Sequence, residues 1–195
     1  MYQLGITGGI GSGKTLVCSI LEVLGIPVYY ADREARKLMD SSPALRKGIE
    51  GVFGKESYRD GSLDRKYIGA RVFGNPEQLE QLNSLVHPVV RENYRSWVKA
   101  REGAPYVVEE AAILFESGAC RLMDASVMVY APRSIRINRV MERDGVDEKS
   151  VLERMKHQMD EEEKKERADH IILNDGTKMV LPQVIDLHHW FLNNC

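Results

Sequence analysis

Short runs of apolar residues alternate along the chain with longer segments in which apolar positions recur every three to four residues. The short runs are rich in Val, Ile, Leu and Tyr, which is typical of buried strands, and the longer segments have helical spacing. We expect strands at residues 2–7, 26–30, 106–110 and 126–130, and a fifth at 170–173. Such alternation predicts an α/β fold with a central parallel five-stranded sheet flanked by helices on both faces.

One long segment, residues 31–105, breaks this alternation because it contains no convincing strand but several helical patterns. We expect a helix at 43–53, a loop at 54–62, a helix capped by Asp64 and running to about Phe73, and another helix starting at Asn75-Pro76. The His87-Pro88 pair is expected to interrupt that last helix before it resumes at 89–100. The segment therefore reads as an inserted helical subdomain.

After the fourth predicted strand, the chain has helical spacing again at residues 134–143 and from Asp147 onward. The charged cluster at 160–167 follows. Its four-residue offsets pair Asp160 with Lys164, Glu161 with Lys165, and Glu163 with Arg167. We interpret this cluster as a solvated helix face, although a lysine of a mobile segment there can still contact a ligand.

Composition narrows the class of protein. The chain has 195 residues, enough for one domain with a full core, and its net charge of -2 predicts no nucleic-acid or anionic-membrane partner. Cys18, Cys120 and Cys195 lack metal-binding spacing, which favours reduced thiols. With no signal-peptide pattern and no apolar stretch that spans a bilayer, we expect a soluble cytoplasmic protein; its oligomeric state is left open.

The strongest motif is Gly8-Gly-Ile-Gly-Ser-Gly-Lys-Thr15, a complete GxxxxGK[ST] phosphate loop between a predicted strand and a predicted helix. The glycines let several backbone N–H groups face one point, and the helix adds its positive end. Lys14 is expected to reach the outer phosphates of ATP and Thr15 to ligate Mg²⁺. We expect the nucleotide to be held by Gly8, Gly9, Gly11, Ser12, Gly13, Lys14, Thr15 and Leu16.

Acidic residues follow two of the predicted strands, at the carboxyl ends where open parallel sheets bind ligands. Asp32 follows the second strand, and its alternative role is a cap for a helix at 33–39. Glu109 and Glu110 end the third strand. We expect Glu110, or failing that Glu109, to serve Mg²⁺ with Thr15.

Two arginines, Arg139 and Arg143, lie four residues apart on a predicted helix and therefore share one face. Guanidinium groups contact phosphoryl oxygens in pairs and stabilise charge during phosphoryl transfer. Arg139 and Arg143 are therefore candidate catalytic residues, and a solvated basic stripe is the alternative.

Nearly the whole chain resembles the dephospho-coenzyme A kinase family. The matching segments, in order, are Thr7–Thr15, Ala31-Asp32 with Ala35-Arg36, Gly61–Arg65, Val72-Phe73, Leu85–Pro88, Leu114–Glu116, Arg139–Asp144, Arg154 with Gln158, and Ala168-Asp169 with Asn174–Gly176. The chain departs from the family pattern at Tyr30, where an acid is frequent, and at Ala112, where proline is frequent.

The resemblance implies transfer of the γ-phosphoryl of ATP to the ribose 3′-hydroxyl of dephospho-coenzyme A, with Mg²⁺. It implies a core (1–32, 104–143 and 168–195), a helical substrate-binding insertion (33–103) and a lid (144–167). Because a ribose hydroxyl is neutral, it benefits from a carboxylate that accepts its proton, and Asp32 is the predicted base. The expected catalytic residues are Asp32, Lys14, Arg139 and Arg143. The expected substrate contacts are Asp32, Glu110 and, by resemblance only, Arg65 and His87, which can instead brace the insertion.

Two rival functions stay open at this point. One is a kinase of the same architecture that acts on another nucleotide or nucleoside. The other is a nucleotide-dependent switch read by a partner protein. The chain lacks an Asn-Lys-x-Asp guanine-reading motif, which argues against a GTPase switch.

Overall fold

The computed structural model describes residues 1–194, so Cys195 lies outside the described residues. The chain forms two compact units. One comprises Met1–Tyr30 with Ala100–Cys195 and is called here the sheet unit; the other, Ala31–Lys99, is called the helical unit.

The sheet unit is built on five strands in the order β2-β5-β1-β6-β7. They are β1 (Tyr2–Thr7), β2 (Val28–Tyr30), β5 (Tyr106–Glu110), β6 (Ala125–Tyr130) and β7 (His170–Leu173). All neighbouring strands pair in parallel, so the predicted five-stranded parallel sheet is confirmed. Because β1 is the central strand, the loop that follows it leaves the sheet at its middle.

The second strand begins two residues later than predicted. Pro27 has no N–H to donate to a neighbouring strand, although its carbonyl accepts a hydrogen bond from the Val108 N–H at 3.0 Å. Regular pairing of β2 therefore starts at Val28, opposite Val108.

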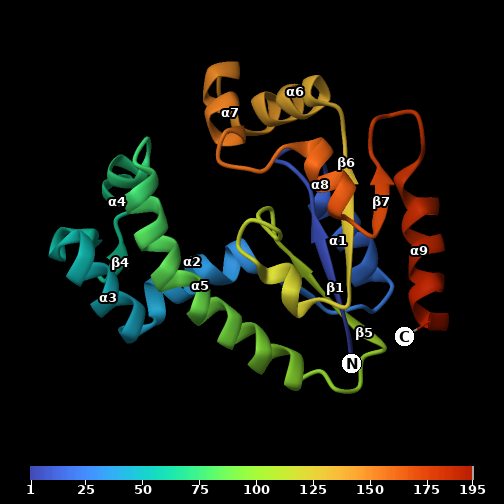
Figure 1. The fold of residues 1–195 in the computed structure, drawn as a ribbon, viewed down its shortest axis with the longest axis horizontal. Coiled ribbons are helices and arrows are strands. Elements are labelled where there is room, and N and C mark those ends of the chain that lie inside the picture. Colours follow the sequence, from blue (N-terminus) through green and yellow to red (C-terminus); the bar gives the residue numbers. More distant parts are fainter. Residues whose placement is uncertain (195) are drawn as a thin grey trace. The chain divides into compact units, whose positions relative to one another are not determined.

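Helices connect the strands of the sheet unit. They are α1 (Lys14–Val23), η2 (Ala119–Leu122), α6 (Arg133–Asp144), α7 (Glu148–Met155), α8 (Glu161–Arg167) and α9 (Val180–Asn194). Figure 1 shows α6 and α7 beyond the carboxyl ends of the strands, which is the edge where ligands bind in parallel sheets.

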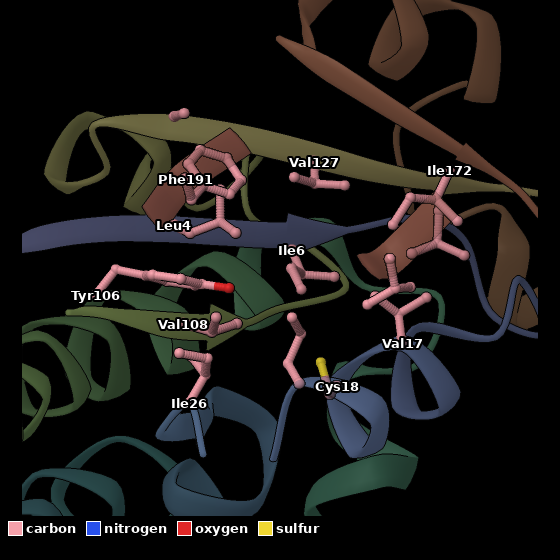
Figure 2. Packing of buried hydrophobic residues seen from close by; sticks show 14 residues of the cluster. Leu4, Ile6, Val17, Cys18, Ile26, Tyr106, Val108, Val127, Ile172 and Phe191 are labelled. Atoms are coloured by element: carbon pink, nitrogen blue, oxygen red, sulfur yellow. The ribbon is translucent and has the colours of Figure 1, made fainter. Parts of the chain in front are cut away.

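One face of the sheet packs against α1 and α9. Figure 2 shows Leu4 and Ile6 of β1 among side chains from both helices, including Val17 and Phe191. Leu4, Ile6, Val17 and Phe191 are fully buried, and burial of a side chain of this size contributes about 1.5–3 kcal/mol to stability. The opposite face at β1 carries Gly5, where an added Cβ would lie 2.6 Å from the Leu114 side chain. Both faces are therefore covered, as a parallel sheet requires.

The helical unit has its own small core. Its elements are α2 (Ala31–Ser41), α3 (Pro43–Phe53), η1 (Lys55–Ser57), β3 (Tyr58–Arg59), β4 (Ser62–Leu63), α4 (Arg65–Val72) and α5 (Pro76–Lys99). Ile49, Phe53, Tyr58, Leu63 and Ile68 form the buried cluster. Asp64 caps α4 as predicted, because its carboxylate accepts hydrogen bonds from the N–H groups of Lys66 and Tyr67.

The expectation of a plain loop at residues 54–62 was wrong. Strands β3 and β4 pair in antiparallel fashion across Asp60-Gly61. Both turn residues have positive φ, 50° at Asp60 and 85° at Gly61. A two-residue Asp-Gly connection with this backbone is a favoured hairpin turn, so the sequence did carry the signal.

The expectation that His87-Pro88 interrupts a helix was also wrong, because α5 runs through Pro88 without a break. A proline inside a helix removes one backbone hydrogen bond and costs about 3 kcal/mol. Here Val86, Val90 and Tyr94 are buried on the same helix, and their packing offsets that cost. The alternative role of Asp32, as the cap of the following helix, does not agree with the structure. Helix α2 begins at Ala31, so Asp32 lies in the first turn of the helix and is not its N-cap.

Within residues 1–194, Cys18, which is buried, and Cys120 form no disulfide. None of the helices in residues 1–194 is both long enough and apolar enough to cross a bilayer.

Candidate active site

The segment between β1 and α1 is a tight loop that only glycine can form at several positions. Gly8, Gly11 and Gly13 have φ of 143°, 80° and 100°. An added Cβ would lie 2.4 Å from the Val129 carbonyl at position 8 and 2.5 Å from the Arg136 carbonyl at position 11. The N-cap of α1 is Gly13, which offers no side-chain acceptor to the first turn. Backbone N–H groups and the positive end of α1 therefore face the same region, which favours an anion.

The lysine of this loop, Lys14, is buried and points back across it. Its Nζ atom donates a hydrogen bond to the Gly8 carbonyl at 2.9 Å and lies 3.7 Å from Glu110 Oε1. Glu110 is the last residue of β5 and is in register with Ile6 of β1. The structure thus brings together the lysine and the acid that the sequence singled out.

Glu109 and Glu110 point to opposite faces of the sheet, because successive strand residues alternate. Glu109 is in register with Gly5 and is buried. The Glu110 carboxylate is within ion-pair distance of Lys14.

The remaining loop residues differ in exposure. The Thr15 side chain is exposed on the first turn of α1, and Leu16 is half exposed. The Ser12 hydroxyl is buried and has no hydrogen-bond partner within residues 1–194. An added Cβ at position 8 would lie 2.7 Å from this hydroxyl, so Ser12 packs inside the loop.

Asn174 and Arg139 support the outer side of the loop. The Asn174 side-chain amide, just beyond β7, donates to the Ser12 carbonyl at 2.8 Å. Arg139 Nη2 donates to the Asn174 carbonyl at 3.1 Å and to its Oδ1 at 3.3 Å, and Nη1 reaches the Gly11 carbonyl at 3.5 Å. A strand end, a helix and the loop are therefore joined through two side chains.

Arg143, one turn further along α6, makes different contacts from Arg139. Its guanidinium donates to both carboxylate oxygens of Asp144, at 2.8 and 3.1 Å, and Arg154 donates to the same carboxylate at 2.6 Å. These hydrogen bonds from Arg143 and Arg154 lower the pKa of Asp144 to about 2. The structure therefore brings Arg139 to the phosphate loop, while Arg143 pairs with Asp144.

Residues 158–164 also contact the loop and the β5–β6 connection, which sequence reasoning missed. The Gln158 side-chain carbonyl accepts a hydrogen bond from the Ile10 N–H at 2.9 Å. Lys164 is fully buried and pairs with Glu116 at 2.9 Å. Glu161 lies 3.6 Å from Arg136, whose guanidinium is buried beside Gly9.

These contacts correct the predicted pairing of the cluster at 160–167. Glu163 does pair with Arg167, as expected. Lys164 pairs instead with Glu116 and Glu161 with Arg136, because one side of α8 is buried against the sheet unit. The four-residue spacing described only the exposed side of this helix. For Arg136 a signal existed, since it lies three residues before Arg139 on the same helix face.

The other three candidate residues, Asp32, Arg65 and His87, belong to the helical unit. Arg65 pairs with Asp40 at 2.8 Å. His87 lies on α5, where burial, and then the nearby charge of Arg91, lowers its pKa. Asp32 is exposed, two residues after the end of β2.

Comparison with known proteins gives one consistent answer. The family model described as "CoaE: Dephospho-CoA kinase" matches residues 2–179. The dephospho-CoA kinase of Bacteroides fragilis strain YCH46 is 40% identical over 185 residues, which cover 95% of this chain and 90% of that protein. The one from Salinibacter ruber is 45% identical over 180 residues, covering 91% and 90%. Among solved structures, dephospho-CoA kinase from Campylobacter jejuni superposes with a TM-score of 0.71 at 26% identity, covering 98% of each chain.

Proposed function

The chain belongs to the dephospho-CoA kinase family, and from this premise we propose how its residues carry out the reaction. The enzyme uses ATP to phosphorylate dephospho-CoA, which is the dephospho-CoA kinase reaction of CoA biosynthesis. We assign the acceptor atom as the ribose 3′-hydroxyl, and we place the ATP phosphates in the loop at residues 8–15. The observation that carries this placement is the convergence of Lys14 and Glu110, 3.7 Å apart, at the glycine-rich N-terminus of α1.

Lys14 is the residue that neutralises the transferred group. Phosphoryl transfer depends on positioning and on stabilising charge at the outer oxygens. Lys14 Nζ binds the Gly8 carbonyl, a neutral acceptor, and a phosphate oxygen is a stronger acceptor because it is charged.

Thr15 and Glu110 would hold Mg²⁺ together with the phosphates of ATP. Their hydroxyl and carboxylate oxygens are the hard donors that Mg²⁺ prefers. In residues 1–194 there is no cluster of three or more His, Cys, Asp or Glu side chains that could hold a metal by itself. The Thr15 hydroxyl and the Glu110 carboxylate fit an Mg²⁺ ion whose other ligands include the phosphates of the substrate. When bound, Mg²⁺ neutralises phosphate charge.

Asp32 is the proposed general base, which accepts the proton of the attacking hydroxyl. It lies two positions after Tyr30, the last residue of β2, and Tyr30 is in register with Glu110. Two residues of chain span at most about 7 Å, so connectivity alone ties Asp32 to the carboxyl edge of the sheet. Its exposed carboxylate on the first turn of α2 is accessible to a substrate.

Arg139 and Arg143 are proposed to complete the positive site, and residues 144–167 to act as a lid that excludes water. The Arg139 contacts with Gly11 and Asn174 support its part in this assignment. Arg143 would have to leave Asp144 to take part. An Arg139→Ala, Arg143→Ala double variant with unchanged kinetics would remove both from the mechanism. Arg65 and His87 are proposed to contact the substrate, although Arg65 also pairs with Asp40.

The test of the function follows ADP and CoA together. Purified protein is mixed with Mg-ATP and dephospho-CoA, and products are measured by mass spectrometry with and without acceptor. We expect acceptor-dependent gain of one phosphate, and a loss of at least about 100-fold in Lys14→Ala. Lys47→Ala, which removes an exposed lysine of α3, is the matched control and should retain activity.

Other outcomes point to the two rivals. If ATP is consumed only with a different nucleoside or nucleotide acceptor, the enzyme is another kinase of this architecture. Slow hydrolysis that no acceptor accelerates, but that a partner protein changes, would indicate a switch.

A further inference from the structure

Arg136 places a buried guanidinium directly on the phosphate loop. It lies on α6 and only 5% of the residue is exposed. An added Cβ at Gly9 would lie 2.0 Å from Arg136 Nη1 and 2.4 Å from Glu161 Oε1. The guanidinium and the carboxylate of Glu161 therefore both pack against the backbone of Gly9, in the segment that we propose to bind phosphate.

The ion pair between Arg136 and Glu161 is buried, but its polar atoms make few hydrogen bonds. Arg136 Nε donates to the Ala131 carbonyl at 3.1 Å, but its Nη1 lies 3.6 Å from Glu161 Oε1, beyond hydrogen-bond distance. The other carboxylate oxygen, Glu161 Oε2, is buried without a hydrogen-bond partner within residues 1–194. A buried carboxylate oxygen without a partner is costly, so the pair is not explained as an optimised structural brace.

The surroundings of the Glu161 carboxylate are those of an anion site. Burial raises its pKa, the nearby positive charges of Arg136, Lys164 and Lys14 lower it, and the charge of Asp160 raises it. Of these cations, Arg136 lies 3.6 Å from the carboxylate, beside Gly9. The pair also borders a cavity of about 350 Å³ that Arg133, Lys156, Gln158 and Met159 help to line.

We infer that Arg136 is a phosphate-binding residue of this enzyme and that Glu161 competes with ATP for its guanidinium. A phosphoryl group offers three oxygens in place of two and matches the planar, forked guanidinium. When a phosphate oxygen takes Arg136, Glu161 is displaced from the loop. The inference rests on the proposed placement of ATP phosphates at residues 8–15.

Competition between Glu161 and ATP predicts that a variant lacking this carboxylate binds nucleotide more tightly than the parent protein. Apparent affinity falls by the fraction of molecules in which Arg136 is held by Glu161, so removing that charge should tighten nucleotide binding. Glu161→Gln keeps the size of the side chain and removes the charge. We expect it to lower the dissociation constant of a non-hydrolysable ATP analogue about 3- to 10-fold. Glu166→Gln, an exposed position on the same helix, is the matched control and should stay within about twofold.

The opposite variant tests the guanidinium itself. Arg136→Gln should weaken binding of the analogue about 10- to 100-fold, because it removes a charged hydrogen-bond donor. Arg121→Gln removes an exposed arginine from the sheet unit and should leave binding unchanged. In the Arg136→Gln background, Glu161→Gln should no longer tighten binding, because no guanidinium is left for which Glu161 and the phosphate compete.

Isothermal titration of these variants with the Mg-bound analogue separates the outcomes, and thermal melts report folding. If Glu161→Gln binds no tighter than Glu166→Gln, or if Arg136→Gln binds like Arg121→Gln, the pair is only a brace and the inference is overturned. If Arg136→Gln does not fold, Arg136→Lys with Glu161→Gln decides in its place. Failure of the parent protein to bind the analogue, or an unchanged affinity in Lys14→Ala, overturns the proposed phosphate site itself.

Discussion

Lys164 is fully buried, and its Nζ atom lies 2.9 Å from Glu116 Oε1. The same oxygen accepts a hydrogen bond from the Met159 N–H at 2.8 Å, and Lys164 also donates to the Ala112 carbonyl at 2.8 Å. Glu116 thereby ties residues 159–164 to the connection between β5 and β6. A buried lysine is stable in its charged form only because these acceptors replace water.

Glu116→Gln should destabilise the protein, because it leaves the Lys164 ammonium buried beside a neutral group. Breaking a buried ion pair by removing one partner costs about 3–5 kcal/mol. The Glu116 side chain is 21% exposed, so we expect a smaller loss, about 1–3 kcal/mol in the free energy of unfolding. Urea denaturation measures it. Glu163→Gln, which breaks the exposed pair with Arg167, should cost less than about 1 kcal/mol, and equal losses in the two variants would contradict this account.

That ion pair also shows where sequence reasoning stops. The sheet and the phosphate loop could be predicted, because their signals are local: an apolar run, a glycine pattern, an alternation. The partner of Lys164 could not, since Glu116 is 48 residues away and four-residue spacing offers a closer candidate in Asp160. Charge spacing describes a helix in water, and α8 has one side in contact with protein.

Other parts of the fold were predictable but were misread. Asp60-Gly61 is a local hairpin signal, and its two positive φ values are what the dipeptide favours. Pro88 is different, since a proline ordinarily ends a helix and only the packing of α5 keeps it continuous. Helix periodicity could have identified Arg136, because it lies three residues before Arg139. Its burial beside Gly9 could not be predicted, because it depends on how α6 packs on the loop.

Asp32→Asn should slow turnover while leaving ATP binding almost unchanged. General-base catalysis contributes about 10²- to 10⁴-fold, and the amide cannot accept the proton of the hydroxyl. We expect kcat to fall within that range in a CoA-formation assay, with nucleotide affinity within about twofold by titration. Glu34→Gln is the matched control, an acid-to-amide change in the same first turn of α2. If Asp32→Asn turns over like Glu34→Gln, Asp32 is not the base.

Glu110→Gln should raise the Mg²⁺ concentration needed for half-maximal activity. Losing a carboxylate that orients a bound ion, directly or through water, typically weakens metal affinity about 10- to 100-fold. Glu109→Gln provides the comparison, because it makes the same change one residue away on the opposite face of β5. We expect only Glu110→Gln to shift the Mg²⁺ titration. A shift in Glu109→Gln alone would move the metal role to that residue.

His188 gives the stability of the protein a defined pH dependence. Its Nδ1 atom shares a hydrogen bond of 2.8 Å with the Tyr106 hydroxyl, and both residues are buried between α9 and β5. Burial, and then the nearby His189, lowers the pKa of His188 below its ordinary value of 6.5. A neutral imidazole ring can accept a hydrogen bond from the tyrosine hydroxyl at Nδ1, whereas a protonated ring can only donate hydrogen bonds.

The direction of this pH dependence is set by whether the folded or the unfolded state binds the His188 proton more tightly. Between pH 6.5 and the lower folded-state pKa, the unfolded chain is protonated at His188 and the folded chain is not. The free energy of unfolding should therefore be fully retained above pH 6.5 and should fall as the pH drops through this window. His188→Gln should flatten that part of the profile, whereas His189→Gln, at an exposed position, should retain most of it, because burial is the larger cause of the lowered pKa. Urea denaturation at pH values between 5 and 8 makes the comparison. The two profiles are subtracted because His87, whose pKa is also lowered, contributes in the same direction to both variants.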